Sequence, residues 1–154
     1  MSTAWHEAGH AVMAMILGRV VEKLTICPAE LQTGGSRLGA CKMQKGRSRS
    51  ASDKLEEDVL VLLSGMVGER QYTEQYCRQG AAQDLLTARR LLLKRAGTDH
   101  QAERLERRML DKAEHLLSQR GHAEALRLIA EELLRKETIS GRAVRHLFEQ
   151  AAKV

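Results

Sequence analysis

Two histidines and a glutamate have the spacing of a metal-binding helix. In His6-Glu7-Ala8-Gly9-His10 the histidines are four residues apart. Residues at this spacing lie about 40° apart around a helix axis, so both imidazoles can reach one metal ion, with Glu7 beside it. Two imidazoles and one further ligand suit Zn²⁺, which lowers the pKa of water to about 7 and lets a glutamate act as general base. The motif therefore predicts zinc-dependent peptide hydrolysis, with His6 and His10 as ligands and Glu7 as the catalytic residue.

The third metal ligand must come from another segment, because the residues after His10 lack the glycine and histidine that extend this motif in one class of peptidases. Asp84 is the candidate, since it follows Gly80 and lies in the first turn of an expected helix. Glu69 is a rival oxygen donor. Cys77 is a weaker rival, because a free cysteine is more often a small buried hydrophobe than a ligand.

Hydrophobic spacing predicts the elements that would position these residues. Helices are expected from Ser2 or Thr3 to Gly18, from Ser52 through Met66, from Ala81 to Ala96, from Asp99 to Lys136 with a break near Gly121, and from Ser140 to Ala152. Two shorter runs, Val20–Cys27 and Leu38–Met43, predict a small β-hairpin or sheet. The predicted fold class is α+β and mainly α, with a helical bundle in the second half. Gly65 and Gly68 in the second helix indicate a close helix contact.

Composition places the chain among ordinary globular proteins. Its 154 residues are 43% hydrophobic and 29% charged, which predicts one domain over residues 1–154. The longest apolar run, Ala11–Leu17, is shorter than the roughly 18 to 20 residues of a transmembrane helix, and no secretory signal is visible. A cytoplasmic protein is therefore expected. The three cysteines are odd in number and widely spaced, which favours reduced thiols: Cys27, Cys41 and Cys77.

A basic cluster offers a different kind of function. The net charge is +5, and the densest group of cations is Lys42, Lys45, Arg47, Arg49 and Lys54. This cluster could bind RNA or a membrane surface, but a solvated loop would have the same composition. Nucleic-acid binding usually adds stacking aromatic residues. Because the chain has only four aromatic residues, no nucleic-acid partner is expected: Trp5, Tyr72, Tyr76 and Phe148.

Five segments match the motifs of one known family. They include Thr3–Val12 with the histidine motif, Leu24–Ile26 followed by Pro28, and Lys136–Ser140. Leu63–Arg70 is similar to Gly-Gly-Arg-x-Ala-Glu-Glu, with departures at Ser64, Met66 and Arg70, and Gly80–Leu85 is similar to Thr-Gly-Ala-x-x-Asp, with Gln79 in place of threonine. Through these segments the chain resembles the peptidase domain of the FtsH-type ATP-dependent zinc metalloproteases.

The resemblance implies a ligand set, a substrate class and an assembly. Asp84 matches the aspartate that binds zinc in the family, so the resemblance implies Zn²⁺ held by His6, His10 and Asp84. It implies an endopeptidase of unfolded or unfoldase-delivered polypeptides, and a hexameric ring. This sequence contains no Gly-x-x-x-x-Gly-Lys-Ser/Thr phosphate loop. Either it is a fragment that lacks the family's ATPase half, or it is a stand-alone peptidase that acts on accessible chains or uses a separate ATPase as unfoldase.

Three points stay open at the level of sequence. A non-catalytic, zinc-stabilised interaction module of the same fold is the alternative to an enzyme, although the intact Glu7 counts against it. The run Leu38–Met43 is a candidate edge strand for an extended substrate. The group that stabilises the oxyanion is unassigned among four further histidines: His100, His115, His122 and His146.

Overall fold

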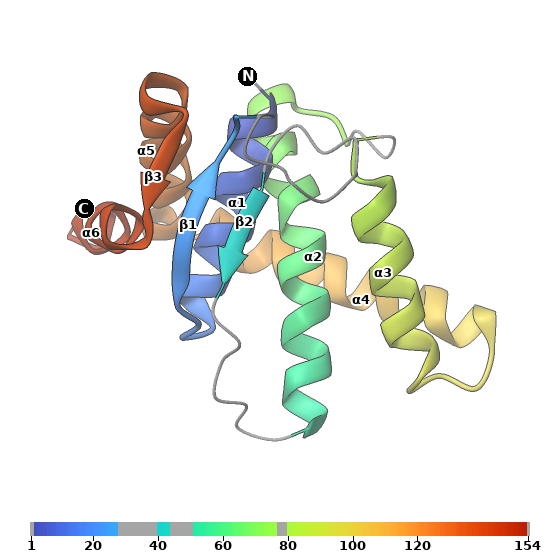
Figure 1. The fold of residues 1–154 in the computed structure, drawn as a ribbon. Coiled ribbons are helices and arrows are strands. Elements are labelled where there is room, and N and C mark those ends of the chain that lie inside the picture. Colours follow the sequence, from blue (N-terminus) through green and yellow to red (C-terminus); the bar gives the residue numbers. More distant parts are fainter. Residues whose placement is uncertain (1, 28–39, 44–50, 77–79, 154) are drawn as a thin grey trace.

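The computed structural model describes residues 2–27, 40–43, 51–76 and 80–153 (Figure 1). Helices and strands follow one another as α1 (Ser2–Ile16), β1 (Val21–Thr25), β2 (Ala40–Met43), α2 (Ala51–Thr73), α3 (Ala82–Leu93), α4 (Asp99–Ser118), α5 (Arg120–Lys136), β3 (Thr138–Ser140) and α6 (Gly141–Ala151). This mainly helical α+β architecture confirms the fold class that the sequence predicts.

Within the described residues the sheet has three strands in the order β2-β1-β3, and both pairings are antiparallel. Leu24 at its centre is paired with Cys41 on one side and with Ile139 on the other. The β1–β2 pair confirms the predicted hairpin or sheet. The sequence analysis did not predict β3, because three residues are too few to show a strand's alternation of polar and apolar side chains.

Each predicted helix is present, but some boundaries differ: α2 continues beyond Met66 to Thr73, and α3 ends at Leu93 rather than Ala96. The fourth helical region differs as well. The break there lies at Gln119, whose backbone is extended, and Gly121 lies inside α5. The prediction of a break near Gly121 was therefore two residues late. Glycine in the first turn of a helix is tolerated, so it marks a helix end less reliably there than after the last turn. Among the described helices, none has both the length and the apolar character needed to cross a membrane.

Helix α1 lies in the centre of the core. Its fully buried side chains include Ala8, Val12 and Met13, and it contacts α2, α5 and β1. In Figure 1 it lies behind the sheet, with α2 beside it. Small residues between the histidines keep α1 narrow where α2 crosses it. The position of the histidine motif in this packed centre fixes the backbone that carries its side chains.

Glycines allow α1 and α2 to come this close. A Cβ added to Gly68 would lie 2.5 Å from the Trp5 carbonyl oxygen and 2.9 Å from the Gly9 Cα. A Cβ on Gly9 would lie 2.2 Å from the Ser64 carbonyl oxygen. Both collisions are with backbone atoms, which cannot move without separating the helices. The sequence-based expectation of close contact at Gly68 is confirmed.

We therefore expect Gly68→Ala to destabilise the fold. The gain in helix propensity from Gly to Ala is smaller than the cost of overpacking, so the free energy of unfolding should fall by about 1–3 kcal/mol. Urea denaturation measures this. Gly121→Ala is the matched control, because a Cβ there would lie 3.7 Å from its nearest neighbour, the Ala151 carbonyl oxygen. Equal midpoints for the two variants would contradict the close contact.

Candidate metal centre and active site

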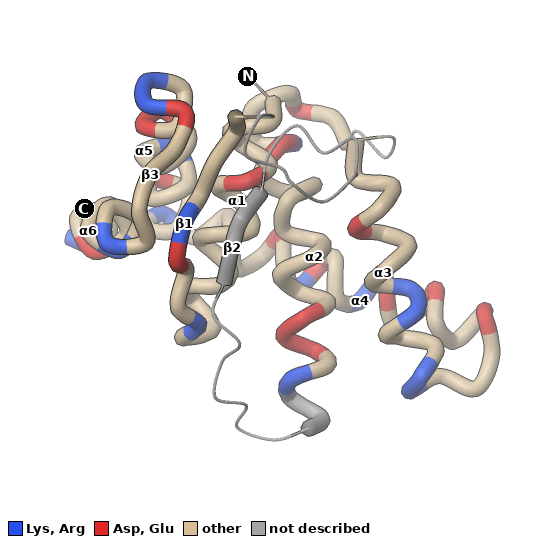
Figure 2. The backbone as a smooth tube through the Cα atoms, in the orientation of Figure 1, with Lys and Arg blue, Asp and Glu red and all other residues tan. Residues whose placement is uncertain are grey.

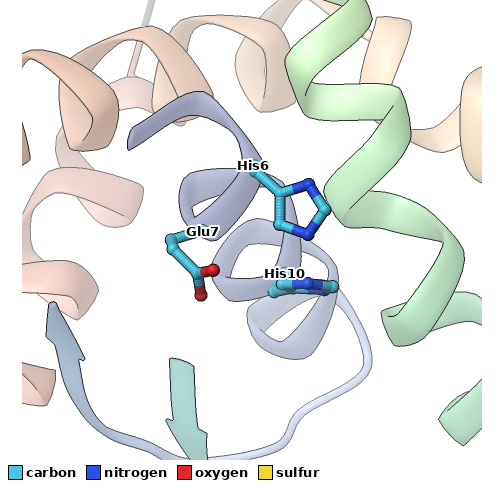
Figure 3. A group of neighbouring side chains, drawn as sticks. All are labelled: His6, Glu7 and His10. Atoms are coloured by element: carbon cyan, nitrogen blue, oxygen red, sulfur yellow. The ribbon is translucent and has the colours of Figure 1, made fainter. Parts of the chain in front are cut away.

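Helix α1 brings the three residues of the histidine motif together (Figure 3). One potential ligand atom from each of His6, Glu7 and His10 lies within 4.8 Å of the others. The two imidazole rings are nearly perpendicular, with centroids 4.7 Å apart. Glu7 and His10 are buried, with 5% and 8% of their surface exposed. The spacing of four residues thus produces the shared face that the sequence analysis expects.

Helix α2 orients both imidazoles through their Nδ1 atoms. The His10 Nδ1 donates a hydrogen bond to the Val61 carbonyl oxygen at 2.6 Å. The His6 Nδ1 lies 3.3 Å from the Glu69 Oε2. A proton on Nδ1 leaves Nε2 of a neutral imidazole with its lone pair, which is the form that binds a metal ion. Each ring is therefore prepared to bind through Nε2.

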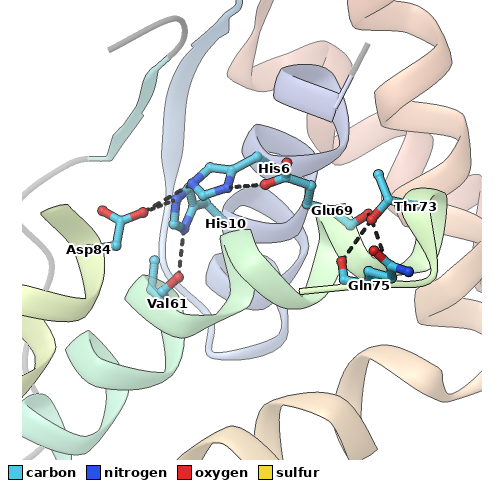
Figure 4. A network of polar contacts seen from close by, with 7 residues as sticks. All are labelled: His6, His10, Val61, Glu69, Thr73, Gln75 and Asp84. Atoms are coloured by element: carbon cyan, nitrogen blue, oxygen red, sulfur yellow. Dashed lines mark hydrogen bonds and ion pairs between the residues drawn. The ribbon is translucent and has the colours of Figure 1, made fainter. Parts of the chain in front are cut away.

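Helix α3 supplies a carboxylate to the same point (Figure 4). The Asp84 Oδ2 lies 3.0 Å from the His6 Nε2 and 3.2 Å from the His10 Nε2. Leu85, Ala88 and Leu92 are buried on one face of α3 and hold this helix against the core. The Arg89 Nε also pairs with the Glu106 Oε2 of α4 at 3.3 Å. These contacts fix the turn of α3 that carries Asp84.

The electrostatics of the site favour positive charge between these groups. Burial alone would lower the pKa of His10, but the hydrogen bond to Asp84 and the nearby Glu7 carboxylate outweigh it and raise the pKa to about 9. Burial alone would raise the pKa of Asp84, but hydrogen bonds from His10 and His6 outweigh it and hold that pKa well below its usual range. A metal ion here would compete with the proton on His10.

The rival ligands have different positions. Glu69 approaches the Nδ1 side of His6, whereas Asp84 approaches the Nε2 side. Cys77 lies outside the described residues. Val61 and Gly65 belong to the site although sequence reasoning did not include them. Val61, Gly65 and Glu69 are spaced four residues apart, so they lie on the face of α2 that is turned toward the histidines. This spacing is the sequence signal that could have identified them.

The residues present fit a zinc ion. Two imidazole Nε2 atoms and one carboxylate oxygen form the donor set that zinc prefers in catalytic sites. A Cβ added to Gly65 would lie 2.6 Å from the Nε2 of His6 and 2.6 Å from the Nε2 of His10. The bare Cα of Gly65 thus leaves space beside both nitrogens, where a side chain would block access to them.

Other candidates from the sequence lie apart from this centre or outside the described residues. Strand β2 covers Ala40–Met43 of the expected edge strand and is an outer strand of the sheet, whereas residues 38 and 39 are not described. Most of the basic cluster also lies outside the described residues, and the described helices carry both signs of charge (Figure 2). The four remaining histidines belong to α4, α5 and α6, whereas the centre is built from α1, α2 and α3.

A comparison with protein families gives one match that includes this centre. The model of peptidase family M41 matches residues 1–96, which contain α1, α2, α3 and strands β1 and β2. His6, Glu7, His10 and Asp84 all lie within the matched segment. A comparison with curated proteins finds no match.

Proposed function

Because the chain belongs to peptidase family M41, the FtsH peptidase family of zinc metallopeptidases, we propose that it is a zinc-dependent endopeptidase of unfolded polypeptides. The observation that carries this proposal is that the Asp84 Oδ2 lies 3.0 Å from the His6 Nε2 and 3.2 Å from the His10 Nε2, with the Glu7 carboxylate beside the histidines. In this proposal His6, His10 and Asp84 are the ligands and Glu7 is the general base.

The zinc ion, when bound, supplies Lewis acidity and lowers the pKa of water to about 7. Glu7 accepts one proton from the attacking water as the new C–O bond forms at the scissile carbonyl. It then gives that proton to the leaving amine nitrogen as the C–N bond breaks, so its carboxylate is regenerated. Burial of Glu7 supports this role, because α1 holds the carboxylate in a fixed place beside the histidines.

The sheet supports the choice of an extended polypeptide as substrate. Among the described residues, strand β2 is paired with β1 and lies at the end of the strand order, so its other backbone edge is a candidate for pairing with an added strand. Such pairing uses hydrogen bonds to the main chain of the substrate. The substrate segment must therefore have main-chain groups that are not already hydrogen-bonded. Unfolded proteins meet this requirement, and folded ones would need an ATPase to unfold them. On the family resemblance, the proposal also includes the assembly of this chain into a hexameric ring.

Metal analysis combined with casein hydrolysis tests the proposed activity. We expect stoichiometric zinc in the purified chain, loss of hydrolysis on chelation and its return when zinc is added back. Casein should be cleaved while a hyperstable folded domain survives, because the bare chain cannot unfold it. Equal cleavage of the two substrates would contradict the requirement for an extended chain. Hydrolysis that persists without zinc would contradict the enzyme class.

A further inference from the structure

We propose that Gly65 is a positioning residue of the metal centre, and that its missing side chain lets both imidazoles meet the ion at a cost in helix stability. The inference rests on the proposed function, because it concerns how the zinc ligands are arranged. It assigns a role to a residue that carries no functional group. The geometry of α2 against the two histidines supports it.

The three nearest atoms to a Cβ built on Gly65 all belong to the imidazoles. They are the Nε2 and Cε1 of His10 and the Nε2 of His6, each 2.6 Å away. Contacts below 3.0 Å do not persist, so one or both rings would have to turn. Each ring is held on its other side, by Val61 for His10 and by Glu69 for His6. A methyl group at residue 65 would therefore break these supports or move Nε2 away from Asp84.

This collision differs in kind from those at the neighbouring glycines. A Cβ on Gly9 or Gly68 would meet backbone carbonyl oxygens, so substitution there separates the helices. A Cβ on Gly65 would meet the ends of two side chains, which can rotate without moving either backbone. The expected damage at Gly65 is thus local to the ligands.

The stability of α2 should change in the opposite direction. Gly65 lies well inside a helix that runs from Ala51 to Thr73, where glycine is among the least favourable residues and alanine the most favourable. If space alone decided the residue, alanine would be the better choice for the helix. A site that is kept at the expense of stability is typical of functional positions.

The test compares Gly65→Ala with the wild type and with Gly121→Ala, a helical glycine that has room for a Cβ. Zinc affinity is measured by competition with a chromophoric chelator, and thermal unfolding is followed in the metal-free proteins. We expect Gly65→Ala to lose zinc affinity by about 10- to 100-fold, as for loss of the groups that orient metal ligands. Its metal-free melting temperature should equal or exceed that of the wild type. Gly121→Ala should keep the zinc affinity of the wild type.

Wild-type zinc affinity in a folded Gly65→Ala variant would overturn the inference and leave the proposed function intact. Absence of zinc from the wild type would instead remove the proposed function, and the inference with it. If Gly65→Ala fails to fold, the substitution is repeated in a chain that carries His6→Ala and His10→Ala. Recovery of folding there supports a collision with the imidazoles, whereas continued unfolding shows a backbone collision and overturns the inference.

Discussion

Glu7→Gln is expected to reduce kcat/KM on casein by at least about a hundredfold while the protein keeps its zinc and its fold. Glutamine has nearly the size and shape of glutamate but cannot accept the proton of water at neutral pH. Loss of a positioned general base removes roughly 10²- to 10⁴-fold of rate, which is about 3 to 5 kcal/mol of barrier. Initial rates of casein hydrolysis, with zinc content measured on the same samples, give the result.

Glu103→Gln is the matched control for this substitution. Glu103 is exposed on α4, a helix that contributes no side chain to the metal centre, so the same chemical change there should leave kcat/KM unaltered. If wild type and Glu7→Gln hydrolyse casein at the same residual rate with full zinc, the enzyme is the wrong proposal. The non-catalytic, zinc-stabilised interaction module would then replace it.

The fold class was predictable because its signals are local. Apolar residues at helical spacing indicate each long helix, and residue types that favour turns, in the sequence Thr33-Gly34-Gly35-Ser36, stand between two strand-like runs. Strand β3 lacked such a signal, since it is short and its partner β1 lies more than a hundred residues away in the sequence. Its pairing is a tertiary contact, as the hydrogen bond between the Thr25 and Thr138 hydroxyls at 2.7 Å illustrates.

The candidate site was predictable only where it is carried by functional groups. His6, Glu7 and His10 can be recognised from their residue types and from their spacing on one helix. Asp84 comes close to the histidines through tertiary packing. The sequence alone therefore left Glu69 and Cys77 as alternative third ligands. Gly65 has no donor atom, and its role in the site depends on how closely α2 packs against α1. The spacing of residues in the sequence does not predict the distance between the two helices.

Removal of any one zinc ligand is expected to abolish stoichiometric zinc. His6→Ala, His10→Ala and Asp84→Ala would each leave two protein ligands for an ion that prefers three in a catalytic site. Metal analysis after gel filtration, at a zinc concentration that saturates the wild type, measures the loss. Full zinc occupancy in any of these variants would exclude that residue from the ligand set.

The rivals at Glu69 and Cys77 should behave differently from the ligands. Glu69→Ala should retain zinc at saturation but bind it more weakly, by about 10- to 100-fold, because the His6 Nδ1 would lose the carboxylate 3.3 Å away that orients its ring. Cys77→Ala should bind zinc as the wild type does. If Glu69→Ala lost zinc completely while Asp84→Ala kept it, Glu69 would become the third ligand. The contact of Asp84 with both imidazoles would then be a salt bridge of the metal-free protein.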